Sequence, residues 1–583
     1  MNNQLLELRK EYREQIEKKD KISKVLSSTR IIIFLFFIMG LVIYSNSNLH
    51  YIRVILFFLI ISFIIVAIYH SVIKNDKNKL IMYVDIITKY EDCSNGKWKD
   101  VRKDFLDLDI QFMNDLDIIG KSSLFQLIDF TSSLGGKRRL LDTLSLRNVS
   151  KKSILSNQEA ITELKDNFGF VLQFQEKLSN IEKIEKIDFE EFFYLFDKKT
   201  NNKLKDLIIS TIISILTIIT FVLSMFNLIS SYYFIGLFFF QIASSYFYTI
   251  IYKNEFNTIS ICARKFSMLK NVYNYIKRQK FSSEKNKMLQ NDIIEGQKTL
   301  DKLIKISILD SFRCNFITYI VFNVFLSLNF VILYNYARLL NNENQIFKKS
   351  IKALEELETL VSLSTICFIK KDVCKPVFND TISIKVSNIK HPLLKEEKCI
   401  ANDFECNSDI NIITGSNMSG KTSFMRTIGI NLVLAYTGAY VNASSFSCSI
   451  MKIFTSINVK DDINNGISTF YGELQRIKTI LDFSNKNKEP MIIFIDEIFK
   501  GTNYNDRIFG AMETLKKLSL LNCIVFMTTH DFELCEINNK KIKNYHFSEL
   551  YNNNKIFFDY KIKDGKCTTT NAKYLMKQMQ IIN

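Results

Sequence analysis

Long stretches without a charged side chain constrain the fold of this chain more than any other feature of its sequence. The stretches 31–51 and 54–72 contain no Asp, Glu, Lys or Arg, and a third uncharged stretch covers 207–252. A helix needs about 20 apolar residues to cross a bilayer, so the first two stretches have the length of one span each and the third has the length of two. Polar residues at 45–48 and at 227–231 provide turns. The sequence therefore predicts two membrane-spanning hairpins, 31–72 and 207–252.

A fourth uncharged stretch, 314–337, is the candidate for a fifth span, but it is predicted to be a buried core helix instead. It contains four Asn residues and Ser327, and so many polar side chains are unfavourable in lipid. Four spans leave both termini on one side, and the Lys/Arg-rich flanks 9–30 and 74–79 assign that side to the cytoplasm. A fifth span would move the C-terminal part out of the cytoplasm. We therefore expect a multi-pass cell-membrane protein with its C-terminal domain in the cytoplasm.

The net charge of +17, from 77 Lys and Arg against 60 Asp and Glu, has two interpretations. A basic chain suits a nucleic-acid partner. Cytoplasmic flanks of spanning helices also collect Lys and Arg. Charge alone does not separate the two.

The remaining segments differ in their periodicity. Residues 1–30 read as a basic cytoplasmic helix, and 73–206 and 253–374 are helical in pattern, as two parts of one all-α core and lever domain. From residue 375 to 583, short β-rich runs alternate with helical stretches, which is typical of an α/β domain with a parallel sheet. The predicted fold is thus multidomain, with membrane hairpins, an all-α lever domain and a C-terminal α/β domain.

The strongest motif lies at 415–422, with the sequence GSNMSGKT. It fits the phosphate-loop pattern G-x-x-x-x-G-K-[ST], follows the apolar strand 410–414 and opens a helical run. Gly415 and Gly420 let the backbone N–H groups turn towards phosphates, and the helix N-terminus adds positive charge. We expect Lys421 to reach the β- and γ-phosphates of ATP and the Thr422 hydroxyl to ligate Mg²⁺.

Two further apolar runs end in polar residues. Asp496 and Glu497 follow the run 491–495; Asp496 is predicted to face the Mg²⁺ and Glu497 to position or deprotonate the attacking water. A strand that simply ends in two solvated acids is the structural alternative. His530 follows the run 524–529 and is predicted to contact the γ-phosphate. A purely structural histidine is the alternative there.

With these motifs in this order, the chain resembles the MutS family of ATPases, in the ABC-type ATPase superfamily. The resemblance covers about 150–200 residues of the C-terminal domain, one domain's length, and identifies that domain as a P-loop, ABC-type ATPase. A weaker resemblance to the family's helical core and lever covers 115–141, 158–164 and 357–363. The blocks that carry the stronger resemblance are 391–394, 417–418, 425–426, 438–441, 453–455, 461–462, 466–470, Glu473, 496–498, 501–502, Asp506 and 529–534.

The resemblance implies a head-to-tail homodimer with composite ATP sites. Ser468 would reach the γ-phosphate bound by the partner subunit, which makes it, with Glu497 and His530, one of three expected catalytic residues. Asn417 would support the nucleotide within its own subunit, and Tyr560 falls near a position that stacks on adenine. The expected nucleotide-binding set is Gly415, Asn417, Met418, Gly420, Lys421, Thr422, Ser423 and Tyr560, with Thr422 and Asp496 as metal ligands.

The departures from the family leave the function open. A mismatch-recognition domain, a connector domain and a C-terminal extension are not recognisable, and membrane hairpins stand in the N-terminal part. One hypothesis is a membrane-anchored MutS-like ATPase that moves helical levers and associates with DNA, as in mismatch repair. The alternative is a membrane-acting ATPase with a protein or lipid partner and no DNA. A nucleotide-binding scaffold with weak hydrolysis is disfavoured by the intact Lys421, Asp496 and Glu497, and a transporter by the lack of an LSGGQ signature.

Overall fold

The computed structural model describes residues 2–47, 50–101, 110–182, 203–407, 409–457, 469–552 and 555–567. The chain divides into two compact units. The first comprises residues 1–129, 143–161 and 363–583, and the second comprises 130–142 and 162–362. Each unit is described by itself below.

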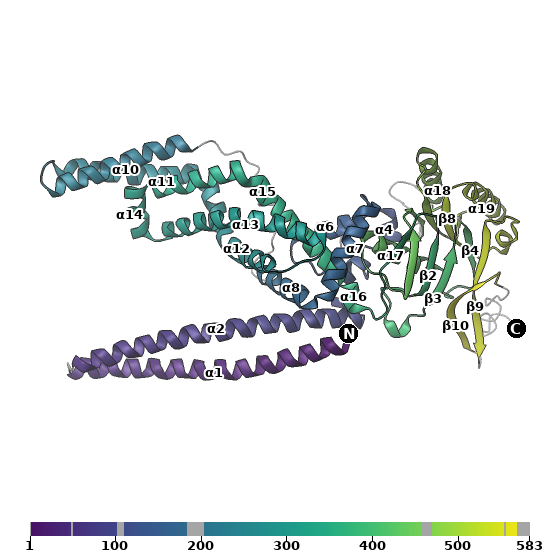
Figure 1. Cartoon of the computed structure of the whole chain (residues 1–583), viewed down its shortest axis with the longest axis horizontal. Coiled ribbons are helices and arrows are strands. Elements are labelled where there is room, and N and C mark those ends of the chain that lie inside the picture. Colours follow the sequence, from purple (N-terminus) through teal and green to yellow (C-terminus); the bar gives the residue numbers. More distant parts are fainter. Residues whose placement is uncertain are drawn as a thin grey trace. The chain divides into compact units, whose positions relative to one another are not determined.

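The first hairpin consists of two long antiparallel helices, α1 (Asn2–Ser47) and α2 (His50–Ser94), which lie side by side (Figure 1). Helix α1 ends at Ser47, within the polar stretch 45–48, and α2 begins at His50. The predicted basic helix 1–30 is not a separate element, because α1 runs through it into the apolar stretch without a break. Polar contacts join the part of α1 before its apolar stretch to the part of α2 after its apolar stretch. One example is the ion pair of Lys19 with Asp76 at 2.9 Å.

Short helices and two sheets complete the first unit. The four-stranded sheet has the order β1-β5-β2-β3 and the six-stranded sheet has the order β10-β9-β4-β8-β7-β6. In the six-stranded sheet every neighbouring pair is parallel except β9 with β10. The helices are α3 (Trp98–Val101), α4 (Gln111–Asp115), α5 (Leu124–Ile128), α7 (Lys151–Asp166), α16 (Ile366–Ile369), α17 (Lys421–Thr437), α18 (Thr469–Lys486) and α19 (Tyr504–Ser519). The strands are β1 (Val377–Asn379), β2 (Ile384–Ile389), β3 (Asn402–Cys406), β4 (Ile410–Thr414), β5 (Ser445–Ser449), β6 (Lys452–Ser456), β7 (Met491–Asp496), β8 (Cys523–Thr528), β9 (Ile542–Asn552) and β10 (Lys555–Asp564).

Apolar helices and side chains cover both faces of the six-stranded sheet. On one face, Ile493 and Val525 pack with Ile477 of α18 and Leu515 of α19. On the other face, aromatic rings of β7, β8, β3 and α17 pack together, with Phe494 and Phe526 stacked at 5.4 Å between centroids. Burial on both faces explains why these strands are continuously apolar in sequence, as parallel strands usually are. The α/β domain predicted for the C-terminal part is thus present.

The second unit is helical among its described residues. Its elements are α6 (Leu134–Leu144), α8 (Phe168–Glu182), α10 (Leu204–Met225), α11 (Ser231–Ile251), α12 (Lys253–Lys277), α13 (Glu284–Ser311), α14 (Phe316–Leu326) and α15 (Leu328–Ser364). Helices α12 and α13 pack antiparallel, with an ion pair of Lys270 and Asp301 at 2.6 Å. The second apolar hairpin is formed by α10 and α11, and its turn lies between Met225 and Ser231, as predicted.

The prediction of one buried core helix over 314–337 is wrong. Ser327 adopts a left-handed conformation (φ 50°), which ends α14 and starts α15 in another direction. Helix α14 turns by 117° from α13, and it exposes Phe316 and Ile317 by 77% and 71%. Only Asn323 and Val324 of α14 are buried. The uncharged run is therefore two helices, of which α14 packs on α10 and α11 and leaves an apolar face uncovered.

Neutral polar side chains join α10, α11, α14 and α15, and we call them the bundle cluster. The amide of Gln241 donates to the hydroxyls of Ser210 and Ser214 at 3.0 Å each, and to Ser327 at 3.2 Å. The Asn323 oxygen accepts hydrogen bonds from the Ser245 hydroxyl and the Asn329 backbone, both at 3.0 Å. Hydrogen bonds of this kind hold helices together where no water competes. The cluster comprises Ser210, Ser214, Gln241, Ser245, Asn323, Ser327 and Asn329.

Four described helices are long and apolar enough to cross a membrane, or five if α13 and α14 together form one bent span. These are α1, α2, α10 and α11, the helices that contain the predicted spans. Their outward faces are apolar and exposed, as at Phe57, Phe58 and Ile209. They are thus candidate membrane spans by length and composition.

Candidate functional site

The phosphate-loop motif lies between a buried strand and a long helix, as its pattern requires. All five residues of β4 are buried, and α17 begins at Lys421. Gly415 (φ 146°) and Gly420 (φ 107°) adopt backbone conformations that side chains rarely permit, and a Cβ on Gly415 would meet the Phe547 carbonyl oxygen at 2.9 Å. The glycines therefore allow the tight curl of the loop.

Lys421 points back into this loop. Its ammonium group donates to the carbonyl oxygens of Gly415 and Ser416 at 2.7 and 2.9 Å. Burial lowers the pKa of Lys421, while Glu497 and Asp496 oppose that shift. A buried ammonium at the mouth of the loop provides the positive charge that a phosphate chain needs.

Asp496 meets the start of α17. Its Oδ1 accepts hydrogen bonds from the Thr422 hydroxyl at 2.9 Å and from the Thr528 hydroxyl at 2.5 Å. The three residues belong to α17, β7 and β8, and the contact depends on the parallel order β4-β8-β7. The two predicted metal ligands, Thr422 and Asp496, are thus in direct contact. Thr528 is an additional contact that the sequence motifs did not predict.

Glu497 and His530 are in direct contact at the same edge, with 3.2 Å between Oε1 and Nε2. The hydrogen bond from His530 is the main reason that the pKa of Glu497 falls to about 2. His530 Nε2 also lies 3.0 Å from Asn417 Oδ1 and 3.3 Å from the Lys421 ammonium. The structure therefore brings together Lys421, Thr422, Asp496, Glu497 and His530, which we call the sheet-edge cluster.

A salt bridge supports the position of the loop that carries His530. Arg507 of α19 makes two hydrogen bonds to Asp531, at 2.7 and 3.0 Å. Bidentate pairs of this kind orient both partners. Arg507 follows Asp506 in the sequence but is not part of the motifs that identified the site. Its contact with Asp531 is visible only in the fold.

Tyr560 lies beside the phosphate loop, although it is far along the chain. A Cβ on Gly420 would come within 3.1 Å of the Tyr560 ring. Asn402 of β3 donates to the Tyr560 carbonyl at 3.0 Å and so anchors this part of β10. Tyr560 is 44% exposed. Its expected role as an adenine platform stays a prediction.

The other expected residues take different positions. Met418 is 87% exposed with φ 67°, and Ser423 is exposed on the first turn of α17. Ser468 lies outside the described residues.

The residues fit a phosphate chain with a bound Mg²⁺. Among the described residues, the buried hydroxyls of Ser416 and Ser419 have no hydrogen-bond partner, and both belong to the phosphate loop. Such donors suit phosphate oxygens. No described group of three or more His, Cys, Asp or Glu is arranged to hold a metal. Thr422 and Asp496 nevertheless offer two oxygen ligands, and Mg²⁺ usually takes one or two protein ligands together with phosphates and water.

Ion pairs connect the short helix α4 to this domain. Asp115 accepts a hydrogen bond from Arg476 of α18 at 2.8 Å and another from the backbone of Ile457 at 3.1 Å. Asp117 pairs with Arg426 of α17 at 2.7 Å. Burial raises the pKa of both carboxyls, which makes their cationic partners necessary. A movement of α17 or α18 would therefore act on the helical segment around α4.

Part of the chain is similar in sequence to known proteins. Residues 411–580 match the family model of MutS domain V. The chain is 32% identical over 226 residues to the DNA mismatch repair protein MutS of Clostridioides difficile (strain 630), covering 37% of this chain and 23% of that protein. It is 34% identical over 239 residues to human MutS protein homolog 4, covering 39% of this chain and 25% of that protein. The matched part thus spans about a quarter of the length of these relatives.

Proposed function

This chain belongs to the MutS family through its domain V, and on that premise we propose that it is a membrane-anchored ATPase. The observation that supports it best is the sheet-edge cluster, in which Lys421, the Thr422–Asp496 contact and the Glu497–His530 pair meet at one edge of the sheet. These are the groups that phosphoryl transfer from ATP to water requires.

Each residue of the cluster has a proposed task. Lys421 exchanges its carbonyl partners for the β- and γ-phosphates, and the loop amides and the Ser416 and Ser419 hydroxyls bind the remaining oxygens. Thr422 and Asp496 hold Mg²⁺, which neutralises charge on the phosphates when bound. Glu497, kept ionised by His530, orients the attacking water and accepts its proton. His530 and Asn417 then bracket the γ-phosphate.

The active form is proposed to be a homodimer with composite sites, in which Ser468 of each subunit contacts the nucleotide of the other. This part rests on the family resemblance. Ser468→Ala should lower hydrolysis without weakening ATP binding to the monomer. Equal turnover in wild type and variant would remove Ser468 from the mechanism.

Four apolar helices support the proposed anchoring in the cell membrane. The basic residues flanking them support a cytoplasmic position of the ATPase domain. A C-terminal tag should therefore be inaccessible from outside intact cells, and a tag detected outside would exclude the four-span topology.

Two kinds of partner are candidates for this ATPase: DNA, and a protein or lipid. The names of its relatives favour DNA, so an association with DNA and a role related to mismatch repair are proposed first. The membrane helices and the match to only a quarter of those relatives favour a protein or lipid partner without DNA.

The deciding experiment is ATP turnover by the full-length chain in lipid nanodiscs, with and without duplex DNA, at low and at physiological salt. Stimulation by DNA that fades with salt supports the first candidate, because phosphate contacts weaken as salt rises. Turnover that ignores DNA supports the second. No turnover in either condition, with intact ATP binding, would contradict the proposed hydrolysis.

A further inference from the structure

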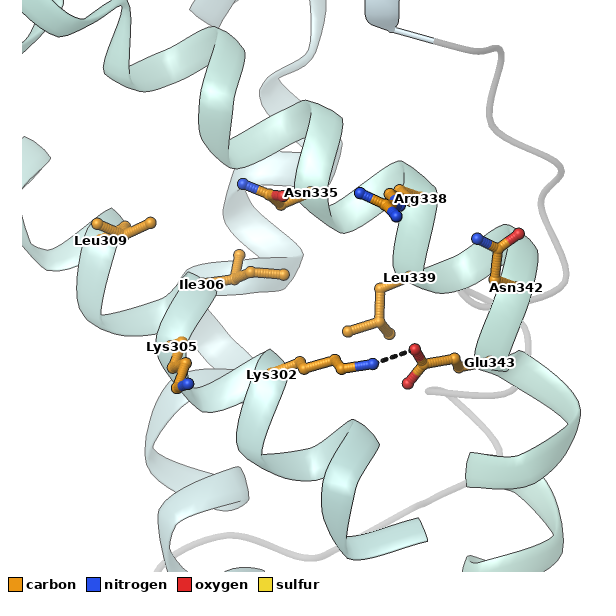
Figure 2. A pocket seen from close by; sticks show the side chains of 9 residues that line it. All are labelled: Lys302, Lys305, Ile306, Leu309, Asn335, Arg338, Leu339, Asn342 and Glu343. Carbon is orange, nitrogen blue, oxygen red and sulfur yellow. Dashed lines mark hydrogen bonds and ion pairs between the residues drawn. The ribbon is translucent and has the colours of Figure 1, made fainter. Parts of the chain in front are cut away.

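A pocket of about 480 Å³ lies between α13 and α15 in the second unit (Figure 2). Ile306, Leu309 and Leu339 form an apolar wall, and Ile306 and Leu339 are almost fully buried. Polar and charged side chains complete the lining: Lys302, Lys305, Asn335, Arg338, Asn342 and Glu343. The pocket thus combines an apolar surface with cationic groups.

The charges of the pocket leave a surplus of cations. Lys302 is paired with Glu343 across the two helices, as the dashed line in Figure 2 shows, and Glu343 also accepts a hydrogen bond from Thr299 at 2.9 Å. Lys305 and Arg338 form no ion pair with any described residue. Three cations and one carboxylate give the lining a formal charge of +2.

The position of the pocket along α15 relates it to the proposed membrane boundary. Phe330 of α15 stacks on Tyr248 of α11, with 4.0 Å between ring centroids. The uncharged stretch ends at Tyr252, about 6 Å beyond Tyr248 along the helix, and Lys203 covers the Tyr252 ring at 3.8 Å. Tyrosine beside lysine is typical of a bilayer interface.

Arg338 lies eight residues beyond Phe330, about 12 Å along α15. Arg338 is also the first charged residue after the uncharged stretch 314–337, a position typical of the cytoplasmic end of an apolar segment. On α13, the end of the helix is held to the start of α12, because Arg313 lies over the Phe256 ring at 3.8 Å. Leu309 thus faces the bilayer side of the pocket, while Lys302 and Glu343 lie farther from it.

We propose that this pocket binds the headgroup of an anionic phospholipid, with Lys305 and Arg338 as its basic contacts and the upper acyl chain against Leu309 and Leu339. Basic pockets at the cytoplasmic ends of membrane helices are suited to such headgroups. The proposal rests on the proposed membrane anchoring. A lipid bound in this pocket would contact α15, the helix that runs from the bundle cluster to Ser364, so α15 would respond to the lipid composition of the membrane.

The test uses the full-length chain in neutral detergent and a fluorescent short-chain phosphatidylglycerol as the probe. The double variant Lys305→Gln/Arg338→Gln should bind the probe about tenfold to thirtyfold more weakly, the loss expected for two basic contacts near a bilayer surface. The control Lys298→Gln/Arg278→Gln removes the same charge from exposed positions of the same unit outside the pocket, and should bind like wild type.

Competition identifies the ligand. Unlabelled phosphatidylglycerol should displace the probe, and phosphatidylcholine with the same chains should not. Equal displacement by phosphatidylcholine, by inorganic phosphate or by duplex DNA would overturn the proposal in favour of an unselective lipid, a free anion or a nucleic acid, respectively. Unchanged binding by the pocket variant would overturn it as well.

Extraction of membranes with alkaline carbonate separates this proposal from the one on which it rests. A chain that stays in the membrane but whose pocket variant binds the probe normally disproves the lipid site alone. A chain released by carbonate disproves the membrane anchoring and the lipid site together.

Discussion

The sheet-edge cluster and the bundle cluster are both groups of polar side chains in contact with one another, but they differ in charge and in contact with solvent. In the sheet-edge cluster, Lys421, Asp496, Glu497 and His530 carry ionisable groups, and about a third of the Glu497 side chain is exposed. The bundle cluster contains only amides and hydroxyls, and Gln241, Ser245 and Asn323 are fully buried. The two clusters thus satisfy their polar groups in different ways.

The difference shows which contacts are exchangeable. Lys421 is bound by carbonyls of its own loop, and a phosphate chain can take their place because solvent reaches the site. A charge in the bundle would cost several kcal/mol without a comparable partner. Neutral hydrogen bonds between helices avoid that cost, and they fix α14 on the hairpin instead of binding a ligand. Four predictions test this contrast, from the largest expected effect to the smallest.

Lys421→Ala should abolish ATP binding and therefore all turnover, because the loop loses its buried cation. The measurement is binding of a fluorescent ATP analogue. The control is Lys478→Ala, which removes an exposed lysine of α18. Binding by Lys421→Ala within threefold of wild type would show that the sheet-edge cluster is not the nucleotide site.

Glu497→Gln should lower turnover by about 100-fold or more while ATP stays bound, as expected for loss of a general base. Single-turnover hydrolysis and retention of ATP are measured together. Glu513→Gln, an exposed glutamate of α19, serves as the control and should hydrolyse ATP normally. Normal turnover by Glu497→Gln would leave Glu497 a structural partner of His530.

Gln241→Leu should destabilise the second unit by about 1 kcal/mol, because three hydroxyls lose a shared donor. The free energy of unfolding of the full chain in mixed detergent measures this. Thr211→Val, whose hydroxyl bonds only to its own helix, should change little. If both variants unfold alike, the bundle cluster does not hold the helices together.

Acid should weaken the first unit slightly through Glu497. The pKa of this carboxyl is about 2 in the fold and about 4.5 otherwise, so its ionised form stabilises the native state. That contribution is fully present above about pH 4.5 and is lost as the pH falls through about 2. Between pH 6 and 3, wild type should lose about 1 kcal/mol more stability than Glu497→Gln, because most of the loss falls below about pH 4.5 and solvent screens a partly exposed group. Denaturant unfolding at both pH values measures it, and a loss of the same size in both proteins would refute the assignment.

Some features of the fold could be predicted from the sequence because they depend on residues that are close together along the chain. The turns of both hairpins, at 47–50 and 225–231, follow from short polar interruptions in apolar runs. The phosphate loop and the two strands that end in Asp496 and before His530 follow from fixed spacing. The sequence also indicated Tyr560 through the family resemblance, and the fold places its ring beside Gly420.

Other features depended on contacts between distant residues. The break at Ser327 was not predicted, because an uncharged run gives no sign of a left-handed residue whose hydroxyl bonds to Ser210, 117 positions away. The Arg507–Asp531 pair and the Asp115–Arg476 pair were missed for the same reason.

By itself, the sequence determined which residues are chemically equipped for nucleotide chemistry and which stretches are apolar enough for a bilayer, since both depend on residue type and local spacing. Only the tertiary structure decided which of these groups meet. The strand order brings Asp496 to Thr422, and the hydrogen bonds of Gln241 and Asn323 hold the uncharged stretch 314–337 against the second hairpin. The physical reason is that a polar group buried by the fold loses its hydrogen bonds to water. It must then form hydrogen bonds with other buried groups, which can lie far away in the sequence.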